Sequence, residues 1–393
     1  MDTIPQELVE SVLDQLAFDR EALKTCSLVS RSFSHRSRKL LFANIVLEPK
    51  ETSKRNPSED FAGLLSRSLS VAPLVQALTL YNFSRGRSSW FSQDRTTVPY
   101  ILRSLTNLNR LTLSGRHYDR RWDGSSDINP VLCRAISQPQ LRSLTLAYAS
   151  FLQPSDFLLL FADCPNLRHV RLSHVYISDQ FTLQLLPPIP SAQVTRPRIE
   201  SLLIQNVPTG LIDVLHDAVD LSSLRKLQFY NNGTTASSDP FQNLLEAAGE
   251  SLEQVIFHGY SSSPANGIDL SQVPNIKCFF TINNFHSGVT VLSGLTELFF
   301  QRYDYAAARM HSVLFHVRCH PKALIECPKA DWTRLERALV HVRRKVRFEI
   351  PVTELEEAMD DPLENAAVDT VRRGLGKLQE AGKLEVVMVQ MAD

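Results

Sequence analysis

One apolar pattern recurs along most of this chain and limits the folds that it can adopt. The pattern is L-x-x-L-x-L, where L stands for any apolar residue, and its first copy is Val75, Leu78 and Leu80. The middle residues of the copies are Leu78, Leu111, Leu144, Val170, Leu202, Leu227, Val255, Phe279 and Leu298, which places them 19 to 33 residues apart. A repeat of this length is typical of stacked units, each too small to bury its apolar face alone.

Short amphipathic segments lie between these copies and predict helices, because their apolar residues recur at helical spacing. They cover residues 98–105, 130–136, 155–161, 211–219 and 241–248. Strands alternating with helices predict right-handed crossovers and a parallel sheet. The region resembles the irregular leucine-rich-repeat domains. That resemblance implies an α/β solenoid with the parallel sheet on its concave side and the helices on its convex side.

The C-terminal end departs from the repeat. Residues 332–340 predict a helix, 346–352 alternate like a strand, and 362–380 predict a long helix. The run LEVVMV at 384–389 predicts a final buried strand. We interpret this end as the cap that shields the last repeat from water.

The N-terminal stretch, residues 3–44, predicts three short helices. Leu8, Val12, Leu13 and Leu16 lie at helical spacing and give the first helix an apolar face. A core built from three short helices is marginal by itself. We therefore expect part of this apolar surface to meet a partner.

The same stretch resembles an F-box in the order and spacing of its apolar residues. The resemblance rests on Ile4-Pro5-x-Glu7-Leu8, Val12-Leu13-x-x-Leu16, Leu28-Val29-Ser30-Arg31-x-Phe33 and Leu40-Leu41-Phe42. It departs mildly from the family, with Ile-Pro for the usual Leu-Pro and Phe33 for a frequent Trp. It implies docking on the Skp-type adaptor of a cullin-RING ubiquitin ligase. The residues expected to make that contact are Ile4, Pro5, Leu8, Val12, Leu16, Val29 and Phe33.

Composition divides the chain into three parts. Residues 1–47 form the predicted F-box, 48–60 a polar linker with two prolines, and 61–393 the predicted solenoid with its cap.

The residues between the inward-facing apolar positions line the other face of the predicted sheet. Basic and aromatic side chains outnumber acidic ones there, which favours a face that binds a protein substrate carrying an acidic or phosphorylated segment. An ordinary solvated sheet face is the alternative. The face comprises Arg110, Thr112, His169, Arg171, Gln205, Lys226, Gln228, Tyr230, Gln254 and His258.

The overall charge narrows the possible partners. The formal net charge is +0, whereas general nucleic-acid or membrane-surface binding usually needs an excess of Lys and Arg. We therefore expect neither nucleic acid nor membrane as a partner. The first ten residues lack a secretory pattern, and the six cysteines contain no C-x-x-C pair. A cytoplasmic or nuclear protein with reduced thiols is expected.

Motifs for catalysis and metal binding are weak. His311, His316, Cys319, His320 and Cys327 could in principle hold zinc, but their spacing matches no common module, and a packed strand with incidental polar residues is favoured. The local signatures of phosphate loops, nucleophile elbows and zinc proteases do not occur. We expect no cofactor and no catalytic residue.

These expectations combine into one hypothesis and two alternatives. The hypothesis is a substrate-recognition adaptor of a Skp–cullin–F-box ubiquitin ligase, which acts by proximity and not by chemistry of its own. One alternative is an F-box and leucine-rich-repeat scaffold without ligase activity. The other is an enzyme whose active site is assembled from residues distant in sequence.

Overall fold

A computed structural model describes the chain over most of its length. The described residues are 5–48, 56–82, 96–115, 122–123, 129–151, 153–162, 164–177, 196–231, 239–259, 270, 273, 276–283, 310–318, 321–352 and 362–390. The chain forms two compact units, Met1–Pro197 and Arg198–Asp393. We call them unit 1 and unit 2 and describe each by itself.

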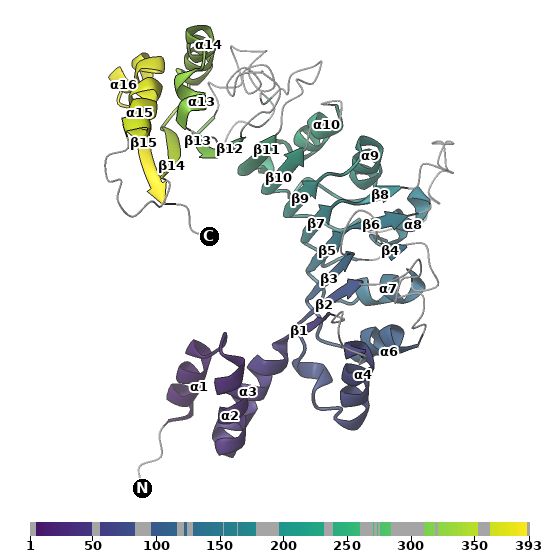
Figure 1. Cartoon of the computed structure of the whole chain (residues 1–393). Helices are drawn as coiled ribbons and strands as arrows, with labels where there is room; N and C mark the ends of the chain where they lie inside the picture. The colour runs from purple at the N-terminus through teal and green to yellow at the C-terminus, as the bar shows by residue number, and fades with distance from the viewer. Residues whose placement is uncertain are drawn as a thin grey trace. The chain divides into compact units, whose positions relative to one another are not determined.

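Unit 1 begins with three helices, α1 (Gln6–Gln15), α2 (Arg20–Val29) and α3 (Arg31–Ala43) (Figure 1). Asp19 ends the first connection, where its side chain accepts a hydrogen bond from the Ala22 backbone N–H at 2.9 Å and caps α2. Ser30 separates α2 from α3 in an extended conformation. Three short helices thus form here as the sequence predicts.

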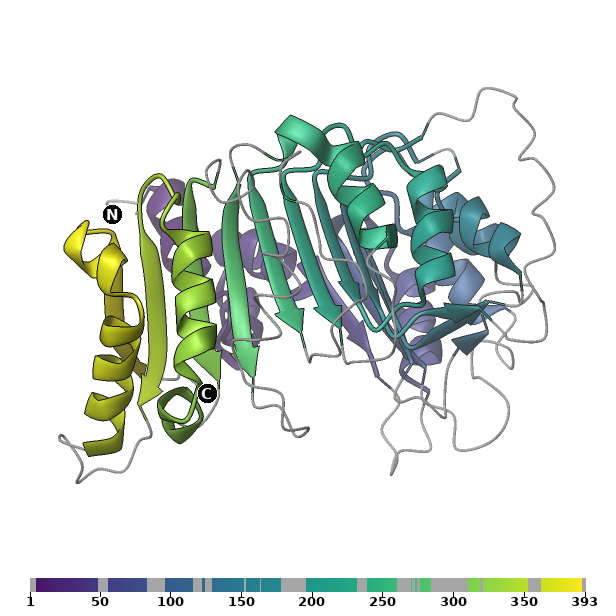
Figure 2. The ribbon, with the colours of Figure 1, turned by 90° about the horizontal axis from the view of Figure 1, so that it is seen from above.

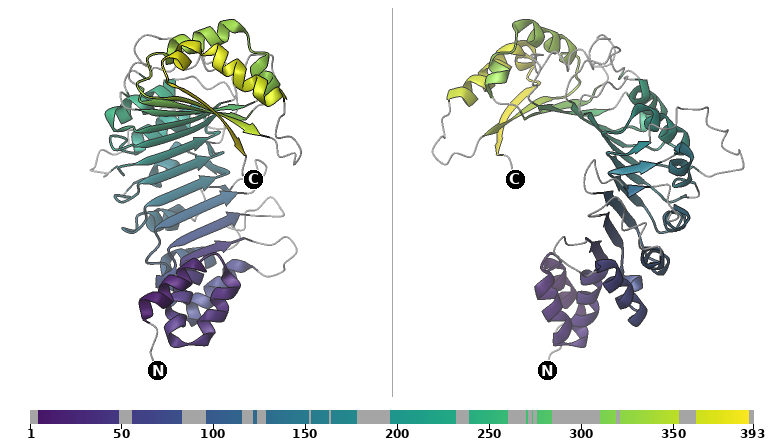
Figure 3. Two further views of the ribbon diagram at one scale, coloured as in Figure 1. Left: turned by 90° about the vertical axis from the view of Figure 1, so that its left-hand side faces the viewer. Right: turned by 45° about the vertical axis from the view of Figure 1, so that its right-hand side comes forward.

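The rest of unit 1 is a parallel sheet with helices on one face. Its strands are β1 (Asn44–Leu47), β2 (Ala77–Asn82), β3 (Arg110–Gly115), β5 (Ser143–Ala147) and β7 (His169–Ser173), paired in that order. Its helices are α4 (Pro57–Arg67), α6 (Thr97–Ser104), α7 (Asn129–Ile136) and α8 (Pro154–Leu159), with a 3-10 turn, η1 (Ala72–Leu74). Strands β4 (Trp122–Asp123), β6 (Ala149–Phe151) and β8 (Tyr176–Ile177) form a small second parallel sheet. The left view of Figure 3 shows the main strands side by side.

Unit 2 repeats the same arrangement (Figure 2). Its parallel strands are β9 (Ser201–Gln205), β10 (Lys226–Asn231), β11 (Gln254–Gly259), β12 (Lys277–Asn283), β13 (Ser312–Arg318), β14 (Val346–Val352) and β15 (Leu384–Gln390). Its helices are α9 (Thr209–Ala218), α10 (Asp239–Ala248), α13 (Pro321–Ile325), α14 (Lys329–Leu339), α15 (Pro362–Gly374) and α16 (Gly376–Glu380), with a 3-10 turn, η2 (Gly249–Ser251). Both units are therefore α/β, with strand–helix repeats and parallel sheets as predicted.

The repeated apolar residues form the core. Leu78, Leu111, Leu144 and Leu202 are fully buried, as are nearly all other members of the described copies. Because side chains alternate along a strand, the residues between them lie on the face of the sheet away from the helices. We call that face of each unit its open face.

Left-handed backbone bends the chain just after three of the strands. Tyr148, His174 and Asn206 have φ values of 52°, 53° and 51°. In unit 1 the rings of Tyr148 and His174 stack in parallel, with centroids 4.6 Å apart. Asn and His adopt this conformation more readily than most residues, whereas a tyrosine such as Tyr148 does so rarely.

The structure corrects three details of the predicted organisation. Strand β15 is not buried: its side chains are mostly half-buried, and Met388 is 50% exposed. The predicted helix at 362–380 is two helices, because Leu375 between them has φ −118° and ψ 43°. Residues 57–60 of the predicted linker form the first turn of α4, with Asn56 as its N-cap. The repeat copy around Leu298 lies outside the described residues.

A helix must be both long and apolar to cross a membrane. Within the described ranges, every helix is too short or too polar to do so.

Candidate docking surface on the three N-terminal helices

The three N-terminal helices have a small core of their own. Val9 and Leu13 of α1, Leu23 of α2 and Leu41 of α3 are buried together. Five partly buried side chains surround them: Leu16, Cys26, Phe33, Leu40 and Phe42. Each helix therefore buries one apolar face against its two neighbours.

Polar contacts fix α1 against α3. The Arg36 guanidinium donates two hydrogen bonds to the Asp14 carboxylate, from Nε at 2.7 Å and from Nη2 at 2.6 Å. At the other end of α1, the Gln6 side-chain amide donates to the Ser32 carbonyl oxygen at 3.1 Å. The start of α1 is thus held beside the junction of α2 and α3.

A second set of apolar side chains on the same helices faces solvent. Leu8 and Val12 are 58% and 59% exposed and lie one helical turn apart on α1. At the end of α2, Leu28 and Val29 are 87% and 67% exposed, and Phe18 is exposed between the two helices. We call these five residues the exposed apolar set. Eleven large apolar side chains are exposed among the described residues, so nearly half of them lie between positions 8 and 29.

The predicted adaptor-contact residues divide into two groups. Pro5, Leu8, Val12 and Val29 are exposed and available to a partner. Leu16 and Phe33 are half-buried against the core, so they position the helices as well as bordering the surface. Ile4 lies outside the described residues.

Two exposed residues were absent from the predicted contact set. Leu28 belongs to the same Leu-Val-Ser-Arg pattern as Val29, and that pattern was the available signal. Phe18 lies in the short connection between α1 and α2, where helical periodicity assigns no face. Only the structure shows that neither side chain packs inside.

The predicted substrate-face residues of unit 1 lie on its open face. Arg110, His169 and Arg171 are exposed there, and Thr112 is half-buried. Strand register places Arg110 and His169 on either side of Ser143, and it places Arg171 beside Thr145 in a row that continues to Thr112. None of the outward positions on β1, β2, β3, β5 and β7 is acidic. This face therefore combines two guanidinium groups with hydroxyl side chains.

The remaining predicted face residues lie on the strands of unit 2. Lys226 and Tyr230 of β10 are half-buried, and Tyr230 stands opposite His258 of β11 in the strand register. Gln205, Gln228 and Gln254 occupy neighbouring outward positions. The side chain of His258 lies outside the described part of the structure. The predicted face is thus divided between the two units.

Farther along unit 2, the open face carries a row of paired charges. His316 Nδ1 lies 3.3 Å from Glu349 Oε2, and Arg347 Nη2 lies 3.1 Å from Glu349 Oε1. Arg347 Nη1 also lies 3.8 Å from Glu385 Oε1. These pairs follow the register of β13, β14 and β15. The charges at this end of the face largely neutralise one another.

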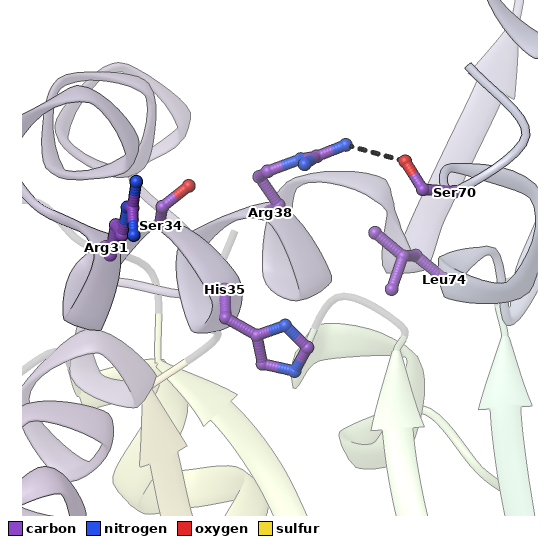
Figure 4. Close-up of a pocket in the computed structure, with 6 residues that line it drawn as sticks. All are labelled: Arg31, Ser34, His35, Arg38, Ser70 and Leu74. Atoms are coloured by element: carbon purple, nitrogen blue, oxygen red, sulfur yellow. Dashed lines mark hydrogen bonds between the residues drawn. The ribbon is translucent and has the colours of Figure 1, made fainter.

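A hollow of about 310 Å³ lies between α3 and the turn that precedes β2 (Figure 4). Arg31, Ser34, His35 and Arg38 line it from α3, and Ser70 and Leu74 line it from the other side. Arg38 Nη2 donates to Ser70 Oγ at 3.2 Å and so joins α3 to the first repeat. Its lining combines basic and hydroxyl side chains with the apolar side chain of Leu74.

Three of the five residues considered for zinc lie in the described part of the chain. His311 lies just before β13, His316 lies within it, and Cys327 is buried after α13. Cys319 and His320 are outside the described residues. In the ranges that the structure describes, no three His, Cys, Asp or Glu side chains gather as metal ligands would. The favoured strand interpretation of this segment is confirmed over Ser312–Arg318.

Comparison with known proteins adds no identification. No family model matches the chain, and no curated protein matches it.

Proposed function

We propose that this protein is the substrate-recognition subunit of a Skp–cullin–F-box ubiquitin ligase. The observation that carries the proposal is the contrast between two sets of apolar residues on α1 and α2. Leu13 and Leu23 are buried in the helices' own core, whereas Leu8, Val12 and Val29 remain in water. Leu8 and Val12 adjoin on α1, and adjoining exposed apolar side chains are typical of a protein interaction surface.

The exposed apolar set suits docking into a groove on another protein. Leu8 and Val12 present adjacent side chains from one helix face, which is how a helix binds in an apolar groove. Leu28 and Val29 extend that contact from the end of α2. Such interfaces concentrate their energy in a few buried anchors, each contributing about 2 kcal/mol or more. The F-box resemblance of residues 4–42 makes a Skp-type adaptor the proposed partner.

The repeats then supply the surface for a target protein. We assign them to the irregular leucine-rich-repeat class, which the parallel strands and their buried leucines support. The exposed Arg110, His169 and Arg171 favour a target with acidic or phosphorylated side chains. Ubiquitin transfer would follow from holding the target near the ligase core, so the chain needs no catalytic residue.

The direct test is co-purification of the full chain with a purified Skp-type adaptor. Leu8→Ala combined with Val29→Ala should abolish the complex while the circular dichroism and melting temperature stay unchanged. Leu69→Ala is the matched control, because Leu69 is a 78% exposed leucine outside the three helices. A double variant that still binds the adaptor like the wild type would refute the docking assignment.

A ligase-free scaffold is distinguished by what else the complex contains. We expect cullin to co-purify with the adaptor-bound protein, and a captured target to acquire ubiquitin in a reconstituted reaction. Adaptor binding without cullin would favour the scaffold.

A further inference from the structure

The parallel strands of unit 2 all begin at the same end of its sheet. We call this row of strand starts the leading edge. Backbone hydrogen bonds join the successive strand starts. The Arg225 N–H donates to the Glu200 carbonyl at 2.9 Å, and the Glu253 N–H donates to the Arg225 carbonyl at 2.9 Å. The His311 N–H likewise donates to the Ile276 carbonyl at 3.0 Å. Side chains at these positions are therefore close neighbours.

Charges alternate along the first part of the leading edge. Glu200, Arg225 and Glu253 precede β9, β10 and β11 in turn. Arg225 Nε lies 3.9 Å from Glu253 Oε1. This part of the edge is close to neutral by its own pairing.

The side chains of the next part of the same edge are basic: four are Lys or Arg, and one is a histidine. Lys277 begins β12, His311 precedes β13, and Arg343, Arg344 and Lys345 precede β14. The Arg343 N–H donates to the Met310 carbonyl at 3.1 Å, and the Arg344 N–H donates to the His311 carbonyl at 3.0 Å. Both arginines are thereby held next to His311. We call these five residues the basic cluster.

The nearest acidic residue along the strand starts is Glu253, whose carbonyl accepts from the Lys277 N–H at 2.9 Å, but its carboxylate pairs with Arg225. Lys345 Nζ lies 3.8 Å from Glu385 Oε2, but that carboxylate also faces Arg347. Lys277, Arg343 and Arg344 are exposed, and among the described residues none of them forms an ion pair with a carboxylate. The pKa of His311 is lowered by desolvation, and then by the charges of Arg344, Lys277 and Arg343. The charges of Arg344, Lys277 and Arg343 thus all reach His311.

We propose that the basic cluster is a docking site for an acidic segment of a partner protein. Neighbouring strands lie about 4.8 Å apart, so the starts of β12, β13 and β14 span about 10 Å. Alternate side chains of an extended peptide repeat at about 6.7 Å, so two or three carboxylates can meet the cluster together. Arginine pairs especially well with carboxylates. Because the whole chain has a net charge of +0, this local excess favours a short acidic segment over the long backbone of a nucleic acid.

The proposal goes beyond adaptor docking and stands independently of it. The basic cluster belongs to unit 2, whereas the exposed apolar set belongs to unit 1. Leu8→Ala with Val29→Ala should therefore leave acidic-peptide binding unchanged. If that variant bound the peptide normally but lost the adaptor, the two assignments would be separated.

Fluorescence anisotropy of a labelled octaglutamate peptide with the full chain tests the proposal. Arg343→Glu with Arg344→Glu should weaken binding about tenfold or more, since it reverses two contacts at the centre of the cluster. Arg334→Glu with Arg337→Glu is the matched control: it makes the same change in net charge at exposed positions of α14. That control should change the affinity less than about twofold, because exposed charges outside the proposed contact are screened by salt.

The outcomes are distinct. The proposal is supported if only the cluster variant loses binding and if peptide raises the pKa of His311, measured by NMR. Tighter binding of a phosphoserine peptide with the same dependence on Arg343 and Arg344 also supports it and identifies the acid as a phosphoryl group. It is overturned if the wild type shows no saturable binding at 0.15 M salt, if both variants lose affinity equally, or if a single-stranded DNA oligomer binds the cluster more tightly. Unchanged melting temperatures confirm that both variants are folded.

Discussion

The Arg36 guanidinium of α3 donates two parallel hydrogen bonds to the Asp14 carboxylate of α1, at 2.7 and 2.6 Å. The two residues are 22 positions apart in sequence, and their contact joins α3 to α1 among the three N-terminal helices. Leu8 and Val12 lie on the helix that this pair holds. The pair therefore helps to orient the proposed docking surface without belonging to it.

Replacing Arg36 with Ala should lower the free energy of unfolding of the three-helix unit by about 1 kcal/mol, because a bidentate, partly shielded pair exceeds an ordinary surface ion pair. Urea unfolding followed by circular dichroism measures the change. Lys24→Ala is the control, since Lys24 pairs with Glu21 in an exposed i, i+3 contact on α2 and should cost much less. Equal losses in the two variants would contradict a special role for Arg36.

Leu13 and Leu8 give opposite expectations for the same substitution on the same helix. Leu13 is fully buried, so Leu13→Ala should cost about 2–5 kcal/mol and unfold the three-helix unit. Leu8 is exposed, so Leu8→Ala should leave stability nearly unchanged and affect only binding. Hydrogen exchange of the α1 amides would distinguish them. Comparable exchange in both variants would show that the core is assigned wrongly.

Gly374 is the last residue of α15 and lies against the buried indole of Trp332. A Cβ atom placed on it would lie 2.6 Å from Cδ2 of Trp332 and 2.8 Å from Cγ and Cε3. The indole is buried and cannot yield easily, so Gly374→Ala should destabilise unit 2 by about 1–3 kcal/mol. Gly376 has no atom within 4 Å of such a Cβ, so Gly376→Ala should be neutral or slightly stabilising. Thermal melts of the two variants make the comparison, and a stable Gly374→Ala protein would refute the packing described for this site.

Cys278 should resist thiol reagents in the folded protein. Burial raises its pKa from 9.0 to about 12, so about one molecule in ten thousand carries the thiolate at pH 8. Iodoacetamide labelling with mass spectrometry should therefore modify the half-buried Cys26 well before Cys278 in the native state, and both at similar rates in denaturant. Native labelling of Cys278 as fast as Cys26 would contradict its burial.

The same pKa shift gives a pH dependence with a definite sign. The folded state keeps the Cys278 proton between pH 9.0 and about 12, whereas the unfolded chain releases it. The unfolded state then binds fewer protons, so the stability of unit 2 should fall as the pH rises through this range. Cys278→Ala should make the decline less steep.

Much of the fold was predictable because it depends on local periodicity. The described copies of L-x-x-L-x-L became strands with buried leucines, and the segments between them became helices within a few residues of their predicted limits. The end of the predicted 362–380 helix was not predictable in this way. Its break at Leu375 accompanies the close contact between Gly374 and Trp332, which are far apart in sequence.

The sequence by itself determined the class of fold and the apolar positions of the three N-terminal helices. Helical spacing marks Leu8, Val9, Val12 and Leu13 as apolar neighbours but does not say which of them a neighbouring helix covers. The tertiary structure decided that Val9 and Leu13 are buried while Leu8 and Val12 stay exposed, because α3 is held against only one side of α1. The tertiary structure also assembles the basic cluster. Lys277, His311 and Arg344 are far apart in sequence, and only the backbone hydrogen bonds between strand starts bring these residues together.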